Sequence, residues 1–143
     1  MKSVILNIIL VSALLGAFGD KGWGSEVTLY QVGNSHTWDS APSDGLVELF
    51  LSAGFDLTNG WHIRCSRPLS YIFENPEDVC VPSNEFGMWT EALTTQRWDS
   101  IILQSYYGAS GQSELDAFTT MLSLRPSHYS SNIYLYVNWP SIS

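Results

Sequence analysis

After about residue 20, short apolar runs alternate along the chain with segments in which apolar residues have helical spacing. Short β-branched and apolar runs, typical of buried strands, occur at residues 27–32, 60–65, 99–104 and 133–137. Between these runs, apolar residues recur every three or four positions, which predicts amphipathic helices. The predicted core-facing helical positions are Leu46, Leu49, Phe50 and Ala53, then Phe86, Trp89, Ala92 and Leu93, then Leu115, Phe118, Thr119 and Leu122.

Local signals set the expected ends of these helices. Ser43 or Asp44 is the expected N-cap of the first helix, and Gly54 is its expected C-cap. The last helix is expected to begin near Ser113 and to end before Pro126. The stretch between residues 66 and 85 contains three prolines and is predicted to be irregular.

This order of elements predicts an α/β fold with a mostly parallel sheet and helices on both faces. Ligands of such sheets bind outside the carboxyl ends of the strands. Polar residues follow all four predicted strands at that edge, in Gly33-Asn-Ser-His36, Cys65-Ser66, Gln104-Ser105 and Asn138-Trp139. We therefore expect the functional site there.

The N-terminus has the pattern of a secretory signal. Lys2 precedes an apolar run over residues 4–18, and small residues around Ala17 and Gly19 favour cleavage after Gly19. The alternative is an uncleaved N-terminal anchor. In either case we expect residues 20–143 to form one exported, extracytoplasmic domain, secreted or periplasmic.

Charge excludes several classes of partner. The 143 residues include 14 acidic and 6 basic side chains, giving a net charge of -8. Because no cluster of Lys and Arg is present, the chain lacks the attraction to phosphate that dominates nucleic-acid binding, and lacks attraction to anionic lipid. A small-molecule or carbohydrate ligand is the expected partner, with no membrane contact beyond a possible N-terminal anchor.

Export changes the interpretation of the two cysteines. Cys65 and Cys80 are expected to form a disulfide in an oxidising compartment. A loop of about 15 residues closed in this way contributes about 3 kcal/mol in the chain-entropy model. The alternative is a metal site, since His62 and Cys65 have H-x-x-C spacing, but a second ligand pair is missing from the sequence.

Ser35 is the candidate nucleophile. It follows a predicted strand directly, within Gly33-Asn-Ser-His-Thr37, so its hydroxyl is expected at the carboxyl edge of the sheet beside backbone N–H groups. The alternative is an ordinary turn in which Ser35 and Asn34 satisfy local backbone groups. The residue types alone do not separate these two interpretations.

The order of these blocks resembles the SGNH (GDSL-like) hydrolase superfamily. The similarity lies in Gly33-Asn-Ser-His-Thr37 after a strand, Cys65-Ser66 after the next, and Trp98-Asp-Ser-Ile-Ile-Leu-Gln104 leading to Gly108-Ala-Ser-Gly111. The resemblance implies a flavodoxin-like three-layer α/β/α sandwich. It also implies an esterase or acetylhydrolase of ester-bearing lipids or carbohydrates, with a Ser nucleophile, no metal and no cofactor.

Three residues take roles from this resemblance. Ser35 matches the nucleophile, and its backbone N–H would be one oxyanion donor. Ser66 stands where the family has a glycine whose N–H is a second donor, which Ser can replace if the turn needs no positive φ. Gln104 stands where the family has an asparagine whose side-chain amide is the third donor, and a glutamine can donate the same bond.

The general base is the main departure from the family. The family carries it in an Asp-x-x-His block, and none occurs in this sequence. We therefore expect either a fragment, incomplete at the C-terminus, or an inefficient hydrolase, because losing a triad member costs a factor of about 10⁴. His36 is adjacent to Ser35 and is expected to diverge from it, His62 is expected in the core, and His128 is expected near the opposite edge.

The tryptophans suggest a second class of function. Trp61, Trp89 and Trp98 are predicted to be buried, whereas Trp38 and Trp139 are placed to line the cleft. A non-catalytic secreted module could hold a glycan or other small ligand there by stacking on indole rings. The expected cleft residues for either function are Asn34, His36, Trp38, Asn138 and Trp139.

Overall fold

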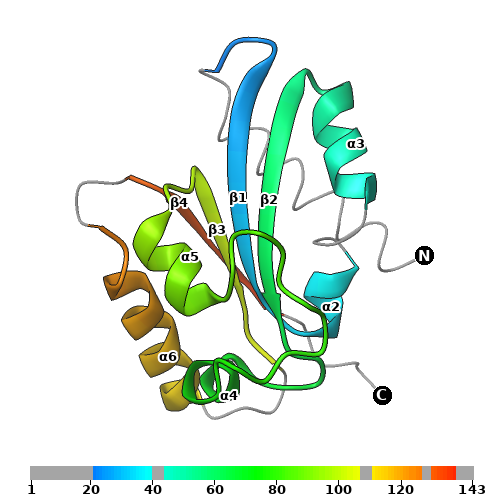
Figure 1. Ribbon diagram of the computed structural model, residues 1–143. Helices are drawn as coiled ribbons and strands as arrows, with labels where there is room; N and C mark the ends of the chain where they lie inside the picture. Colours follow the sequence, from blue (N-terminus) through cyan, green and yellow to red (C-terminus); the bar gives the residue numbers. More distant parts are fainter. Residues whose placement is uncertain (1–20, 40–43, 107–110, 127–129, 138–143) are drawn as a thin grey trace.

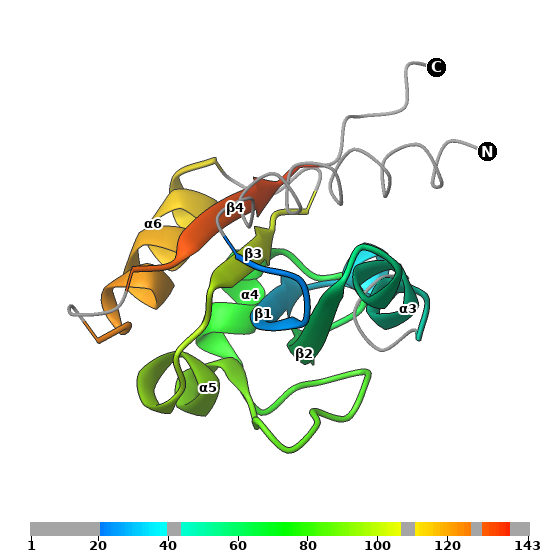
Figure 2. The same ribbon diagram turned by 90° about the horizontal axis from the view of Figure 1, so that it is seen from above.

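The computed structural model describes residues 21–39, 44–106, 111–126 and 130–137. It contains a parallel sheet of four strands in the order β2-β1-β3-β4 (Figure 1, Figure 2). The strands are β1 (Ser25–Gly33), β2 (Phe55–Ile63), β3 (Ser100–Gln104) and β4 (Asn132–Tyr136). The strand order and direction confirm the flavodoxin-like α/β fold expected from the sequence.

Helices cover both faces of the sheet. On one face α4 (Leu69–Glu74), α5 (Trp89–Thr95) and α6 (Gly111–Ser123) supply Ile72, Leu93 and Met121 to a core that includes Tyr30. On the other face α3 (Asp44–Ser52) packs Leu46 and Phe50 against β1 and β2. The short helix α2 (Ser35–Trp38) follows β1 at the carboxyl edge of the sheet, which is at the bottom of Figure 1.

Several element boundaries differ from the sequence prediction. Strand β2 begins at Phe55, five residues before the predicted run, and pairs in register with β1 from there. The prediction missed this part of the strand because Asp56, Thr58 and Asn59 interrupt its apolar pattern. Helix α4 lies inside the stretch predicted to be irregular. It starts directly after Pro68, which is its N-cap, and tertiary packing of Leu69 and Ile72 stabilises it.

Two predicted helical faces are confirmed in part, since Leu46 and Phe50 are buried and Phe118 and Leu122 pack against the core. Leu115 is 52% exposed and Leu49 is 40% exposed, whereas Ala117 and Met121 of α6 are buried. The buried face of α6 also includes the acidic residue Glu114, which was not among the predicted core positions. The predicted C-cap at Gly54 is confirmed: its φ is +86° and its N–H donates to Leu51 O.

The tryptophans divide as follows. Trp89 and Trp98 are each 3% exposed, in agreement with the prediction, and Trp61 is partly buried with its Nε1–H donating to Pro82 O. The expectations for residues 1–19, Ser43, His128, Asn138 and Trp139 lie outside the described residues. Within the described ranges, no helix has the length and apolar character needed to cross a membrane.

The outer edge of β2 is covered by residues 80–84, which we call the strap. Its contacts run along the strand: Cys80 N donates to Ile63 O, and Asn84 Nδ2 donates to Asn59 O. Val81 forms an isolated antiparallel bridge with Ile63. The strap therefore satisfies backbone groups that an edge strand would otherwise expose.

Candidate functional site

The carboxyl ends of β1 and β3 form the topological switch point of the sheet. The connection that leaves β1 leads to β2 on one side, and the connection that leaves β3 leads to β4 on the other side, so the two connections diverge between β1 and β3. Open α/β sheets bind ligands at this point, because diverging connections leave a crevice there. Ser35 follows β1 and Gln104 ends β3, so the structure brings two predicted site residues to the switch point.

Gln104 is fully buried and ties the β1–α2 turn to β3. Its Oε1 accepts hydrogen bonds from Asn34 N, at 3.2 Å, and from Thr37 Oγ1. Because the Asn34 N–H can only donate, the atom of the Gln104 amide that faces it must be the oxygen Oε1. The nitrogen Nε2 therefore lies on the other side of the amide. Gln104 thus has a structural role that the sequence did not predict, and its role as an oxyanion donor stays a prediction.

The contact of Gln104 with the β1–α2 turn requires glycine at position 33, because there is no room for a Cβ atom there. A Cβ at Gly33 would lie 2.1 Å from Thr37 Oγ1 and 2.7 Å from Gln104 Cβ. Thr37 is 2% exposed, yet sequence reasoning gave it no role. Its position three residues after the helix-capping Asn34 was the signal that could have identified it.

Two amide groups at the switch point have no hydrogen-bond partner among the described residues. They are Nδ2 of Asn34 and Nε2 of Gln104, both buried. Asn34 is fully buried as the N-cap of α2, where its Oδ1 accepts from His36 N at 3.2 Å, so it does not line an open cleft as predicted. A buried donor without a partner costs about 1–3 kcal/mol, so the fold retains two costly donors at one place.

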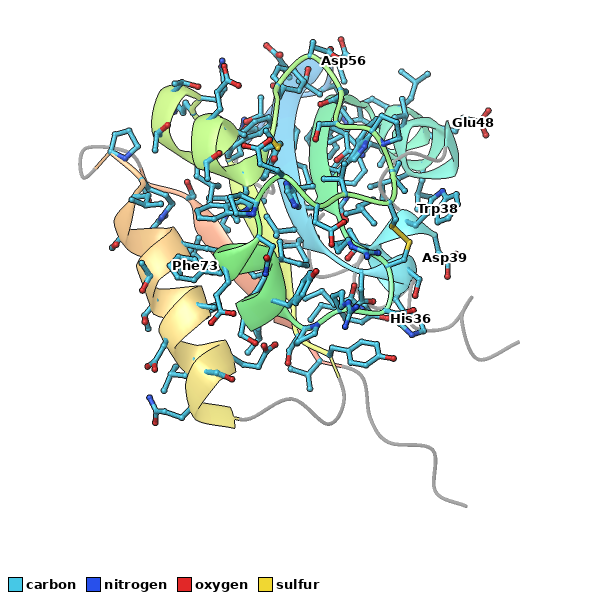
Figure 3. All side chains as sticks on the ribbon, turned by 60° about the horizontal axis from the view of Figure 1, so that its bottom comes forward. His36, Trp38, Asp39, Glu48, Asp56 and Phe73 are labelled. Atoms are coloured by element: carbon cyan, nitrogen blue, oxygen red, sulfur yellow. A yellow bond between two sulfur atoms is a disulfide. The ribbon has the colours of Figure 1, made fainter. Side chains whose placement is uncertain are left out.

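Ser35 is the first residue of α2 and is partly buried. Next to it, His36 is exposed and Trp38 is 50% exposed, and both are labelled on α2 in Figure 3. The structure therefore places the predicted nucleophile, one histidine and one exposed indole on a single turn of helix. Trp38 and His36 are thus exposed at this edge of the sheet, and their role in lining a cleft stays a prediction.

Ser66 adopts a left-handed backbone conformation, with φ at +57°. The sequence analysis allowed Ser to replace the family's glycine only if this turn needed no positive φ, and the structure contradicts that condition. A non-glycine residue pays about 1–2 kcal/mol for this conformation. Ser66 is exposed and lies three residues after the end of β2, at the same edge of the sheet as Ser35.

The predicted disulfide between Cys65 and Cys80 is confirmed, with the two Cα atoms 5.8 Å apart. Because Cys65 is bonded to Cys80, it is not available as a metal ligand, which excludes the His62–Cys65 alternative. No group of three or more His, Cys, Asp or Glu within the described ranges is arranged to hold a metal ion. A disulfide is consistent with a protein of an oxidising compartment.

An ion pair supports the disulfide at the start of the strap. Arg64 Nε lies 2.8 Å from Asp78 Oδ2, and Tyr71 Oη donates to the same oxygen at 2.8 Å. The hydrogen bond from Arg64, with that from Tyr71, lowers the pKa of the Asp78 carboxyl below its usual range. Both links hold the two residues that directly precede Ser66.

His62 is fully buried on the face of the sheet covered by α5. Its Nδ1 accepts from Trp89 N at 3.5 Å, and its Nε2 has no partner among the described residues. Desolvation lowers its pKa from 6.5 to about 4. His62 is therefore a neutral core residue, as predicted, although only one of its nitrogens is satisfied.

A buried carboxylate that the sequence analysis did not identify holds α4 against α6. Glu114 is 8% exposed, and its two oxygens accept from Leu69 N at 3.1 Å and Ser70 N at 2.8 Å. These donors are unsatisfied within α4 itself, so Glu114 acts as a cap from another helix.

Comparison with known proteins supports the fold. No protein-family model matches the sequence, and no curated protein matches it. The structure is similar to the crystal structure of a DUF4886 family protein from Bacteroides uniformis, with a TM-score of 0.59 and 18% sequence identity, over 77% of this chain and 49% of that chain. The chain thus spans about half the length of that structure, and the likeness establishes the α/β fold.

Proposed function

We propose that this chain is an exported, SGNH-like serine esterase that acts on ester bonds of carbohydrates or lipids, with Ser35 as nucleophile. The observation that carries the proposal is the hydrogen bond from Asn34 N to Gln104 Oε1, which holds the Gln104 amide against the turn that carries Ser35 at the topological switch point.

In this mechanism, Ser35 Oγ attacks the ester carbonyl carbon, the bond to the alcohol oxygen breaks, and the alcohol leaves with the proton. Water then hydrolyses the acyl-serine. The backbone N–H groups of Ser35 and Ser66 and the Nε2 amide of Gln104 are the proposed oxyanion donors. Gln104 Nε2 is buried, so the turn must open locally to admit the oxygen.

No general base for Ser35 is identified among the described residues. His62 lies in the core on the α5 side, and His36 is adjacent to Ser35 on an exposed surface. An activated aryl ester needs little acid catalysis for its leaving group, whereas deacylation needs an activated water. We therefore expect slow turnover and accumulation of acyl-Ser35 when the substrate is an aryl acetate.

The test is incubation with an aryl acetate followed by peptide mass spectrometry. One acetyl group is expected on the peptide that contains Ser35, and none on the Ser35→Ala protein. Ser105→Ala is the matched control, because Ser105 also follows a strand at the same edge and is partly buried. Absence of acetylation, or equal release of the aryl alcohol by wild type and Ser35→Ala, would refute the esterase.

The exposure of Trp38 favours a second candidate, a glycan-binding module. Half of this indole is accessible beside Ser35, which suits stacking on a sugar ring. Binding to a glycan array is expected to be lost in Trp38→Ala and retained in Ser35→Ala. If both variants bind like wild type, or if wild type binds no glycan, this candidate fails.

A further inference from the structure

Among the described residues, the outer edge of β4 is an unpaired edge of the sheet. Its inner edge pairs with β3 from Ser100↔Asn132 to Gln104↔Tyr136, and none of the described strands pairs with its outer edge (Figure 2). The opposite edge of the sheet, at β2, is covered by the strap. Natural edge strands usually carry Lys, Pro or a bulge that prevents pairing, and β4 has no Lys or Pro.

The surface beside β4 is apolar. Leu135 and Val137 are 52% and 51% exposed, and Leu115 of α6 is 52% exposed. Between α6 and β4 lies a groove of about 390 Å³, lined by these three side chains with Leu69 and Phe118. Exposed apolar surface that is contiguous with an open strand edge is typical of an interaction site.

The charge distribution favours approach at this surface by a second copy. The chain has a net charge of -8, yet no Asp, Glu, Lys or Arg occurs after Arg125. Glu114, the acid in the groove wall, accepts hydrogen bonds from two backbone N–H groups of α4. Two copies that repel each other elsewhere therefore meet no like charges from β4.

The sequence of β4 is nearly palindromic about Leu135. Tyr134 and Tyr136 flank Leu135, and Ile133 and Val137 flank the tyrosines. In an antiparallel pair of two copies of this strand with a two-fold axis at Leu135, residues of similar type face each other. Leu135 faces Leu135 of the second copy, each tyrosine faces a tyrosine, and isoleucine faces valine. Such aromatic and β-branched cross-strand pairs stabilise a sheet by roughly 0.2–1 kcal/mol each.

We propose that this chain forms a two-fold symmetric dimer in which β4 pairs antiparallel with β4 of a second copy. The pairing joins the two four-stranded sheets into one continuous sheet and places the apolar grooves beside the two-fold axis. The contact is isologous and closes at two copies, because it consumes the open edge of both partners. This inference is independent of the proposed esterase activity.

The test is the molar mass of the full chain in solution, measured by light scattering over a dilution series. The expected mass is twice that of one chain, 16.0 kDa, at the higher concentrations. Leu135→Arg places two like charges at the two-fold axis and is expected to weaken dimerisation at least about tenfold. Leu51→Arg is the matched control, because Leu51 is an exposed leucine on α3, and the dimer is expected to persist.

A second variant tests the geometry without reliance on the charged one. Leu135→Cys is expected to form a disulfide-linked dimer on oxidation, because residues facing each other across antiparallel strands have Cβ atoms about 4.5–5.5 Å apart. Leu51→Cys is expected to remain unlinked. A monomer at every concentration, an oligomer unaffected by Leu135→Arg, or equal crosslinking of the two cysteine variants would overturn the proposal.

Discussion

The contact between the β1–α2 turn and β3 depends on the missing side chain of Gly33, and Gly33→Ala measures that dependence. The added methyl would lie 2.1 Å from Thr37 Oγ1, 2.7 Å from Gln104 Cβ and 2.8 Å from Gln104 Oε1. Thr37 Oγ1 can rotate away only by breaking its bond to Gln104, and Gln104 Cβ can move only with the backbone of β3. The methyl group therefore cannot be accommodated at no cost.

Three contributions set the expected change in the free energy of unfolding of Gly33→Ala. Overpacking a filled site costs about 1–3 kcal/mol. Loss of the Thr37 bond to Gln104 costs about 0.5–1.5 kcal/mol more. Alanine restricts the unfolded chain more than glycine does, and this effect raises the free energy of unfolding by about 0.4–1 kcal/mol. The free energy of unfolding should fall by about 2–3 kcal/mol, measured as the shift of the urea midpoint followed by far-UV circular dichroism.

Gly111→Ala is the matched control, because a Cβ at Gly111 has no atom within 4 Å and the residue begins α6. Its stability should be unchanged or slightly raised. The double variant with Thr37→Ala removes the closest clash, so the cost of Thr37→Ala should be smaller in the Gly33→Ala background than in wild type. If Gly33→Ala and Gly111→Ala unfold at the same urea concentration, the steric reasoning is wrong.

The remaining predictions concern His62, Ser66 and Glu114. The pKa of His62 is lower in the folded state, about 4 against 6.5, so the unfolded chain binds more protons in that range. The contribution of neutral His62 to the free energy of unfolding should therefore be fully present above pH 6.5 and should fall by about 3 kcal/mol as the pH decreases to about 4. Urea titrations across this pH range should show that His62→Gln lacks this dependence. Ser66→Gly should raise the free energy of unfolding by up to about 1 kcal/mol, since it relieves the left-handed φ, and Ser66→Val should lower it; equal midpoints for the two would contradict the strain. Glu114→Gln replaces one acceptor oxygen and should cost about 1–3 kcal/mol by thermal or urea unfolding, whereas Asp116→Asn at an exposed position of α6 should be neutral.

Sequence periodicity predicted the number and order of the strands, because β-branched apolar runs mark buried parallel strands whatever their partners are. Composition and export signals likewise predicted the Cys65–Cys80 disulfide. The positions of Ser35 and Gln104 at the carboxyl edge followed from the same pattern, since each comes at or just after a predicted strand end. These features are local in sequence and are therefore visible in it.

Tertiary structure decided the features that depend on distant partners. Helix α4 forms because Leu69 and Ile72 are buried and because Glu114, 45 residues beyond Leu69, caps its first N–H groups. Gly33 is needed for its small size beside Gln104, about 70 residues away in the chain, and not for an unusual backbone angle. The positive φ of Ser66 likewise depends on how the chain folds in space. A one-dimensional pattern records which residues are apolar, whereas these properties arise from which residues become neighbours.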